Sequence, residues 1–395
     1  MKHCLLVMSD KSNKPQLNKF IDGMRQLKDC RDKRGRRHTL TFVLCGVTLA
    51  ILSGRTTLSS IQRYLVNRLK WLRQVTGESA GSAVSRAQLP RILSGVDRPA
   101  LNDLTMKHFG IHLIETDEGT WKAIDGKTLC GTPDESGSQR TRIVTAVDHE
   151  SRETEAQCEL NSTKKGEITV VRTFLQETGL EKANVTLDAL HMNPATTAQI
   201  EQAGGHYMIQ AKRNQPELCD RLTTVANTHT PLAILNSVEQ GHGRQEEHWA
   251  WFFDLKAVSF DPRWQESGLQ TLAVLLRQTT QPAKATLAPK ISLELSYYLS
   301  NYSLSSAQPI QPQSLFQAIR RHWGIESVNW IRDVTFQEDH VNTKDNNLAQ
   351  LLASLRTFAI RLLQRARFPN FQAALEQFSD CPDTFFSFLQ DAQIL

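Results

Sequence analysis

The sequence predicts a mixed α/β protein with a helical N-terminal region, a central mixed sheet and a β-rich insertion. Three observations lead to this expectation. Apolar residues recur at helical spacing up to about residue 115, and short β-prone runs separated by glycine, proline and serine follow. A second group of β-prone runs, rich in tryptophan, lies between residues 216 and 305. With 395 residues, the chain is long enough for two or three domains.

The composition indicates a globular protein, with 40% hydrophobic and 22% charged residues. The longest apolar run, residues 39–53, is shorter than the roughly 20 residues that a membrane span needs, and predicts a buried helix. The first residues are polar and lysine-bearing, which does not fit an export signal. The seven cysteines form no C-x-x-C pair, so we expect neither a disulfide framework nor a zinc knuckle. These features predict a cytoplasmic protein without a membrane partner.

The N-terminal region carries a strong excess of positive charge. Residues 1–40 contain eleven Lys and Arg against four Asp, although the whole chain has a formal charge of only +5. This asymmetry points to a polyanionic partner. A basic run of this kind forms either a solvated surface or a phosphate-binding one, and guanidinium groups bind phosphate oxygens in pairs. The candidate DNA contacts in this run are Arg31, Lys33, Arg34, Arg36 and Arg37.

Helical periodicity continues through this region. Asp97-Arg98-Pro99 is typical of a helix N-cap followed by proline. Further helices are expected at residues 17–27, 39–53 and 58–72. Residues 1–115 are therefore expected to form a helical domain.

The region after residue 115 alternates strands and helices. Strands are expected at 123–125, 142–148, 155–160, 184–189 and 206–211, and helices at 168–177 and 194–202. Three strands, helix, strand, helix, strand is the order of an RNase H-like sheet, in which the chain returns through right-handed crossovers.

The second half of the chain is expected to interrupt and then complete this sheet. In the β-rich insertion, strands are predicted at residues 247–255, 269–278 and 291–301. A helix then starts at Ser314 with Gln317 as its capping-box partner. Its apolar stripe includes Trp323 and Trp330, and Glu326 lies on the same face by its spacing. A long amphipathic helix at 348–362 and short C-terminal helices follow.

Three acidic residues stand out in this arrangement. Asp125 and Asp188 each end a predicted strand, and Glu326 lies on a helix that faces the sheet. Carboxylate oxygens are the ligands that Mg²⁺ and Mn²⁺ prefer, and two or three carboxylates can hold a pair of ions about 3.5–4 Å apart. Aspartates at strand ends are also common turn formers. Spacing alone therefore leaves both interpretations open.

Five ordered motifs resemble those of the ISAs-type insertion-sequence transposases, a group that includes the H-repeat-associated proteins. The similarity extends over roughly residues 25 to 366. The motifs are Ile124-Asp125-Gly126-Lys127-Thr128-Leu129, Thr186-Leu187-Asp188-Ala189, Ala211-Lys212-Arg213-Asn214-Gln215-Pro216, Arg320-Arg321-His322-Trp323-Gly324-Ile325-Glu326 and Arg332-Asp333-Val334-Thr335-Phe336-Gln337-Glu338-Asp339. Two positions depart from the wider superfamily, because His322 stands where arginine is expected and Ile319 replaces a tyrosine.

The resemblance implies a DDE transposase that cuts and joins DNA with two Mg²⁺ or Mn²⁺ ions. Asp125, Asp188 and Glu326 would be its catalytic and metal-binding triad. Its partners would be double-stranded DNA, both terminal inverted repeats and target, and a second copy of the chain in the synaptic complex. The alternatives are an RNase H-like metal nuclease that cuts without joining, and a catalytically retired transposase that only binds DNA.

The resemblance and the charge pattern together give the expected organisation. The helical DNA-binding domain spans residues 1–115, the catalytic core 116–215 and 306–367, the β-rich insertion 216–305, and the helical tail 368–395. Near the acids, the sequence predicts DNA contacts at Lys127, Lys212, Arg213, Arg244, Arg320 and Arg321, although solvated strand and helix ends would show the same residues. Asp333 is expected to support the metal site or to pair with an arginine.

Overall fold

The computed structural model describes residues 19–78, 81–111, 120–133, 140–160, 166–241, 243–281, 290–306 and 310–395. The chain divides into two compact units. The first comprises Met1–Ile111 together with Asn347–Leu395, and the second His112–Asn346. Among the helices of the described ranges, none is both long and apolar enough to cross a membrane.

The first unit is helical, as the periodicity predicts. The apolar run at residues 39–53 forms the wholly buried helix α2, with the Thr39 hydroxyl accepting from the Phe42 amide as its N-cap. Asp97 caps α6 in the same way, as expected. The helices of this unit are α1 (Phe20–Gln26), α2 (Leu40–Leu52), α3 (Leu58–Asn67), α4 (Leu69–Thr76), α5 (Gln88–Ser94), α6 (Arg98–Phe109), α12 (Asn346–Arg365), α13 (Phe371–Asp380) and α14 (Pro382–Asp391).

The long helix α12 belongs to this first unit, whereas the sequence assigned residues 306–367 to the catalytic core. Its Phe358 ring stacks on Phe20 of α1 at 4.3 Å and lies 5.3 Å from Phe109 of α6, measured between ring centroids. Buried residues occur on every side of α12, so an amphipathic pattern could not show which neighbours cover it. The C-terminal residues thus return to the N-terminal helices.

The second unit is built on one nine-stranded mixed sheet with the order β3-β2-β1-β4-β5-β9-β8-β7-β6. Strands β1, β4 and β5 run parallel to one another, and the other neighbouring pairs are antiparallel. The strands are β1 (Trp121–Pro133), β2 (Arg140–Asp148), β3 (Thr154–Leu160), β4 (Asn184–Leu187), β5 (His206–Ala211), β6 (Ala233–Gly241), β7 (Arg244–Asp254), β8 (Thr271–Gln281) and β9 (Lys290–Ser300).

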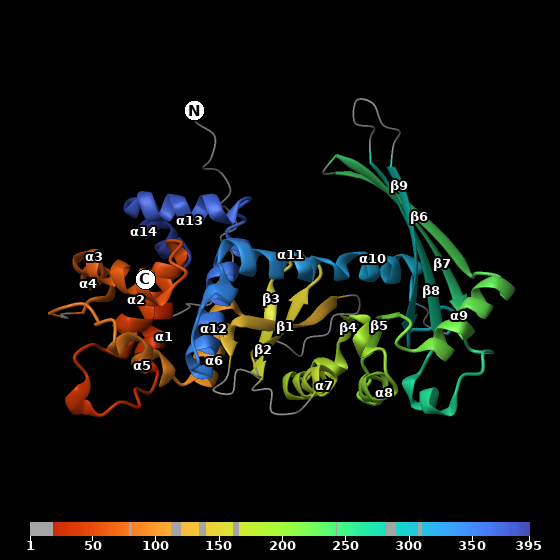
Figure 1. The fold of residues 1–395 in the computed structure, drawn as a ribbon, viewed down its shortest axis with the longest axis horizontal. Coiled ribbons are helices and arrows are strands. Elements are labelled where there is room, and N and C mark those ends of the chain that lie inside the picture. Colours follow the sequence, from red (N-terminus) through yellow and green to blue (C-terminus); the bar gives the residue numbers. More distant parts are fainter. Residues whose placement is uncertain are drawn as a thin grey trace. The chain divides into compact units, whose positions relative to one another are not determined.

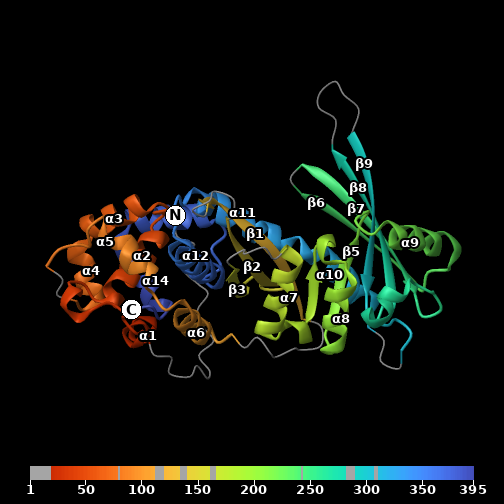
Figure 2. The ribbon, with the colours of Figure 1, turned by 60° about the horizontal axis from the view of Figure 1, so that its bottom comes forward.

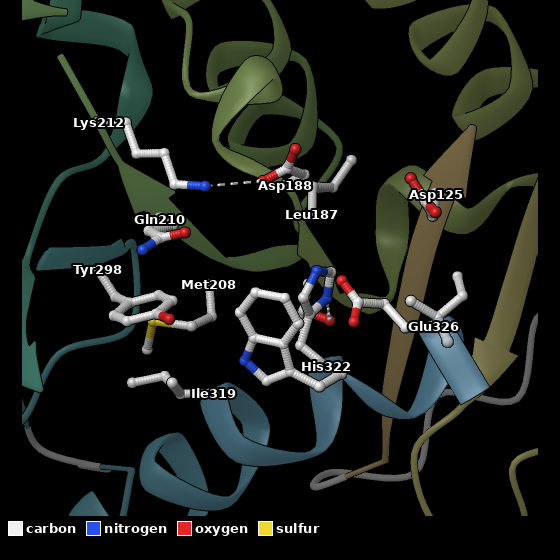
Figure 3. A pocket seen from close by; sticks show the side chains of 13 residues that line it. Asp125, Leu187, Asp188, Met208, Gln210, Lys212, Tyr298, Ile319, His322 and Glu326 are labelled. Carbon is white, nitrogen blue, oxygen red and sulfur yellow. Dashed lines mark hydrogen bonds and ion pairs between the residues drawn. The ribbon is translucent and has the colours of Figure 1, made fainter. Parts of the chain in front are cut away.

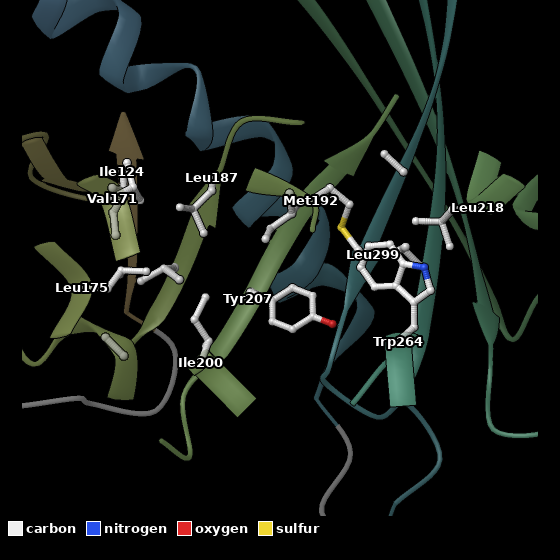
Figure 4. Packing of buried hydrophobic residues seen from close by; sticks show 14 of the residues in the cluster. Ile124, Val171, Leu175, Leu187, Met192, Ile200, Tyr207, Leu218, Trp264 and Leu299 are labelled. Atoms are coloured by element: carbon white, nitrogen blue, oxygen red, sulfur yellow. The ribbon is translucent and has the colours of Figure 1, made fainter. Parts of the chain in front are cut away.

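Helices cover both faces of this sheet (Figure 1). On one face, α7 (Glu167–Thr178) and α8 (Pro194–Gln202) pack with α9 (Pro216–Thr228) on a core that includes Ile124, Leu187, Tyr207 and Leu299 (Figure 4). On the other face, α10 (Pro312–His322) packs on Trp121 and Met208, and α11 (Gly324–Trp330) on Ala123 and Val147. The sheet is therefore the middle of three layers.

The β-rich insertion continues the central sheet instead of forming a separate subdomain. Antiparallel pairing of β9 with β5, for example Ile209 with Leu299, joins strands β6–β9 to the rest (Figure 2). The sequence predicted β7, β8 and β9 but missed β6 and helix α9. The β6 strand alternates half-buried and exposed residues at its start and ends exposed, which leaves a weak apolar pattern.

Two predictions about the helix that carries Glu326 were wrong. It begins at Pro312, one residue after Gln311, without a side-chain cap, so Ser314 and Gln317 form no capping box. It also breaks at Trp323, where α10 ends and α11 starts, and the break changes which residues face the sheet. Trp323 and Trp330 are 46% and 59% exposed, while Ile325 and Val328 are buried.

Candidate active site

The alternation of side chains along β1 and β4 places Asp125 and Asp188 on one face of the sheet. Ile124 pairs with Leu187 in the parallel ladder, and both pack on the α7 side. The next residues, Asp125 and Asp188, therefore lie side by side on the α10–α11 side. Asp188 directly follows β4, as predicted.

Asp125 lies within β1, whereas the sequence placed it at a strand end. Strand β1 continues to Pro133 because β2 goes on pairing with it after β4 has ended. The loss of the β4 neighbour opens space beside Asp125. That space, and not the end of β1, lets its carboxylate line the cavity.

Glu326 reaches the same space from α11. Ile325 and Val328 anchor this helix by packing on Ala123 and Val147, which leaves Glu326 on the exposed side. The three acids line one cavity of about 180 Å³ (Figure 3). Its other lining residues are Thr186, Leu187, Met208, Gln210, Lys212, Tyr298, Ile319, His322, Trp323 and Ile325.

Asp125 is the most perturbed of the three acids. Burial raises the pKa of its carboxyl to about 6, and the negative charges of Asp188 and Glu167 act in the same direction. Two hydrogen bonds oppose this rise in pKa: the Gly126 amide donates to Oδ1 at 2.8 Å and the Asn329 amide to Oδ2 at 2.9 Å. The site thus concentrates negative charge that a cation would relieve.

Asp188 is more open, and its side chain is 58% exposed. Its Oδ1 accepts from the Ala189 amide at 2.6 Å and lies 3.8 Å from Nζ of Lys212, whose side chain is also more than half exposed. Of the six basic residues predicted near the acids, Lys212 alone lines the cavity among the described residues. It remains a predicted DNA contact.

The other five predicted basic residues each pair with an acid outside the cavity. Lys127 contacts Asp333 and lies 3.5 Å from the buried Glu338 and 3.8 Å from Asp339. Asp333 therefore pairs with a lysine, and it lies in a π-helical segment after α11. The remaining pairs are Arg213 with Asp220, Arg244 with Glu246, Arg320 with Glu239, and Arg321 with Glu150.

In the N-terminal basic run, two arginines hold the local turn together. Arg31 forms an ion pair with Asp29 at 2.7 Å, and the Arg36 guanidinium donates to the Asp29 carbonyl oxygen at 2.7 Å. Lys33, Arg34 and Arg37 are exposed. The DNA-binding role of all five cations stays a prediction.

Sequence reasoning did not assign a role to several residues that line the cavity or contact its acids. Asn329 lies three residues after Glu326, a spacing that places both on one helical face, and this signal was available. Tyr298 lies on β9, and nothing local in the sequence indicates that β9 pairs with β5. Thr186 and His322 belong to the sequence motifs, but the motifs do not indicate the hydrogen bond of 2.8 Å that joins them.

The donor chemistry of the cavity fits a divalent metal ion. Three carboxylates with crowded negative charge suit Mg²⁺ or Mn²⁺. Within the described ranges, however, no three His, Cys, Asp or Glu side chains are close enough together to bind one ion. The acids therefore share the cavity without forming a closed three-ligand site.

Comparisons with known proteins identify the family of this chain. The family described as "Transposase DDE domain" matches residues 119–362, and the family described as "DDE_Tnp_1-associated" matches residues 21–109. The chain is 24% identical over 357 residues to "Putative transposase YncI" of Escherichia coli O157:H7, with 88% of each chain covered. It is 24% identical to "H repeat-associated putative transposase YhhI" of Escherichia coli K12, covering 88% of this chain and 91% of the relative.

A mixed α/β unit with three acids around one cavity, matched along its length by the transposase DDE domain, defines a transposase of the DDE class. The chain belongs to this family, and within it to the H-repeat-associated type, which confirms the resemblance found in the sequence.

Proposed function

We propose that this transposase cleaves and joins DNA ends by metal-dependent phosphoryl transfer at the cavity of Asp125, Asp188 and Glu326. One observation carries the proposal: acids from three distant parts of the sequence line one cavity on one face of the sheet. The strand order β3-β2-β1-β4-β5, with β1, β4 and β5 parallel, supports the RNase H-like interpretation of this region.

Asp125, Asp188 and Glu326 would hold the divalent ions, two in number. Bound ions of this kind supply Lewis-acid stabilisation of the charge that develops at phosphorus. The chain's own residues do the rest. Asn329 fixes the orientation of the Asp125 carboxylate through its 2.9 Å hydrogen bond. Lys212, whose Nζ lies 3.8 Å from Asp188 Oδ1, would contact a phosphate oxygen of the DNA strand in the cavity.

The helical first unit would bind the terminal inverted repeats. Its exposed cations Lys33, Arg34 and Arg37 would supply salt-dependent affinity for phosphates, since each neutralised phosphate releases counterions. Joining requires two DNA ends in one complex, so we propose that a homodimer performs synapsis.

The test uses two DNA duplexes copied from the sequence that flanks the gene, one intact to follow cleavage and one pre-cleaved to follow joining, with Mg²⁺ or Mn²⁺. We expect Asp125→Asn, Asp188→Asn and Glu326→Gln to reduce cleavage and joining to background. Asp220→Asn is the matched control, because Asp220 is an exposed acid outside the cavity. Activity retained by the three variants would overturn the site. Cleavage without joining by the wild-type chain would favour the nuclease, and binding without cleavage the retired transposase.

A further inference from the structure

A chain of hydrogen bonds links the cavity to a buried histidine behind it. Thr186 lies on β4, and its hydroxyl is 2.8 Å from Nδ1 of His322, which lines the cavity. The same hydroxyl is 3.0 Å from Nε2 of His149, which follows β2. His149 and Thr186 are 6% and 1% exposed, so water does not complete their hydrogen bonds.

Both imidazoles are neutral at physiological pH. Burial lowers the pKa of His322 to about 4 and that of His149 to about 3. A neutral imidazole carries one proton, on either Nδ1 or Nε2, and its other nitrogen is an acceptor. The two bonds to Thr186 therefore restrict which nitrogen of each ring is protonated.

Three proton arrangements satisfy both bonds. Thr186 can donate to His149, it can accept from both rings, or it can donate to His322. The first leaves the proton on Nδ1 of His149, which has no hydrogen-bond partner within the described structure. The second leaves the buried Thr186 proton without an acceptor among the described residues. The third leaves a lone pair on His149 Nδ1 unpaired and places the remaining proton on Nε2 of His322, which lines the cavity and is not among the buried unpaired atoms. Buried N–H and O–H groups without partners are the rarer and costlier defect.

The geometry points to His322 as a neutral histidine with its proton fixed on Nε2, available as a hydrogen-bond donor to a non-bridging oxygen of the scissile phosphate. Thr186 and His149 are positioning residues, because both are buried and act by selecting the tautomer of His322. Figure 3 shows the His322 ring in the cavity beside Glu326. Its Nδ1 makes the 2.8 Å bond to Thr186.

This assignment separates His322 from the metal ligands. A protonated Nε2 cannot coordinate a metal ion, so His322 would not add an imidazole ligand to the carboxylates around it. A fixed donor aimed at a phosphate oxygen is instead the kind of group that stabilises developing negative charge. The role at the phosphate rests on the proposed phosphoryl-transfer function, whereas the tautomer itself does not.

The tautomer is tested directly by NMR on the metal-free full chain labelled with ¹⁵N-histidine. Long-range proton–nitrogen correlations show which ring nitrogen carries the proton, and His322→Gln and His149→Gln identify the two sets of signals. We expect Nε2–H at His322 in the wild type and in Thr186→Ser, which keeps the hydroxyl. We expect the preference for Nε2–H to weaken in Thr186→Val. Nδ1–H at His322 in the wild type would overturn the inference, whatever the activity.

Kinetics of joining with the flanking-sequence duplex test the role of the donor. His322→Leu should lower the single-turnover rate by about 10²-fold or more, as for the loss of one donor to a transition-state oxygen. His322→Gln, whose amide can place an N–H near the position of Nε2, should keep the rate within roughly tenfold of wild type.

The double variant separates tautomer control from packing. Thr186→Val should slow the wild-type background but add no further loss to His322→Gln, which has no tautomer to select. Equal losses in both backgrounds would show that Thr186 acts only through packing, and would overturn its positioning role. If the carboxylate variants described above stay active, the proposed function fails, and the NMR result still decides the tautomer.

Discussion

Replacing Asp125 by Asn should stabilise the metal-free protein at alkaline pH while abolishing activity. Burial and the charges of Asp188 and Glu167 raise the pKa of Asp125 from 3.8 to about 6. Each pKa unit corresponds to 1.36 kcal/mol, so the ionised carboxylate is less favourable in the folded than in the unfolded chain by about 3 kcal/mol. Asparagine has nearly the same shape and no charge.

One hydrogen bond reduces this gain. The Asn329 amide donates to Asp125 Oδ2, and an asparagine at residue 125 has only one carbonyl oxygen to share with the Gly126 amide. A lost hydrogen bond costs about 1 kcal/mol, which leaves an expected net stabilisation of about 2 kcal/mol at pH 8.

The pH dependence gives the sign of the effect. A raised carboxyl pKa means that the folded chain binds more protons than the unfolded chain between about pH 4 and 6. The favourable contribution of Asp125 is fully present below pH 3.8 and is lost as the pH rises through about 6. The advantage of Asp125→Asn should therefore be present at pH 8 and disappear near pH 4.

The assay is urea unfolding in EDTA at pH 8 and pH 4, with hydrogen exchange of the β4 amides to locate the effect. Adding Mg²⁺ should stabilise the wild type in proportion to RT ln(1 + [Mg²⁺]/Kd) and leave Asp125→Asn unchanged.

Asp148→Asn is the matched control. Asp148 is also buried, but its Oδ1 accepts from the Glu150 and Ser151 amides, so its replacement should not stabilise. A less stable Asp125→Asn at pH 8, or an equal response of both proteins to Mg²⁺, would refute the reasoning.

Three further predictions concern other parts of the chain. Lys127→Met should lower the free energy of unfolding by about 1–2 kcal/mol, because it removes the cation beside Asp333 and beside the buried Glu338, which keeps its 3.0 Å contact with Arg332, and chemical denaturation would show it. Gly205→Ala should cost about 2–3 kcal/mol, since its Cβ would overlap a backbone carbonyl oxygen, while Gly166→Ala meets open space and should leave the melting temperature nearly unchanged. Replacing exposed Arg34 and Arg37 by Ala should flatten the dependence of log affinity on log salt by up to about 2, with unchanged melting; an unchanged slope would exclude phosphate contact.

The parts of the fold that could be predicted are those specified by local chemistry. Strand β5 and helix α8 have their predicted bounds, because glycines and a proline mark their ends and their apolar pattern is regular. Helix α7 ends at Gly179, which adopts the left-handed conformation with φ 73° that favours glycine there. The residues that mark the ends of these helices and strands lie in the elements themselves or directly next to them.

The parts that could not be predicted depend on partners distant in sequence. The membership of α12 in the first unit depends on aromatic contacts with Phe20 and Phe109. The union of the insertion with the central sheet depends on the pairing of β9 with β5. The break at Trp323 was hidden because the helical periodicity continues across it in the sequence.

The candidate site shows the same division between local and distant causes. The motifs and the spacing identified Asp125, Asp188 and Glu326, and the structure brings all three to one cavity, although their metal-binding role stays a prediction. The ion pair that occupies Lys127 could not be predicted, because its partner Asp333 lies 206 residues away in the chain. In the sequence alone, Lys127 is recognisable as a near neighbour of Asp125, and nothing indicates which acid is its ion-pair partner.

Because side chains alternate along the strands, the residues that form the apolar core and the residues that line the cavity lie mainly on opposite faces of this sheet. On β1 and β4, residues Ile124 and Val185 face the apolar α7 side, while Asp125 and Thr186 face the cavity; Leu187 packs in the apolar core and also borders the cavity. The cavity side carries the desolvated carboxylate, and the apolar side supplies burial that offsets its cost. Neutralising the desolvated carboxylate on the cavity side should thus abolish activity while preserving or raising stability, and substitutions on the α7 side should do the reverse. The raised pKa of Asp125 places the first residue of the triad among those where activity and stability are opposed.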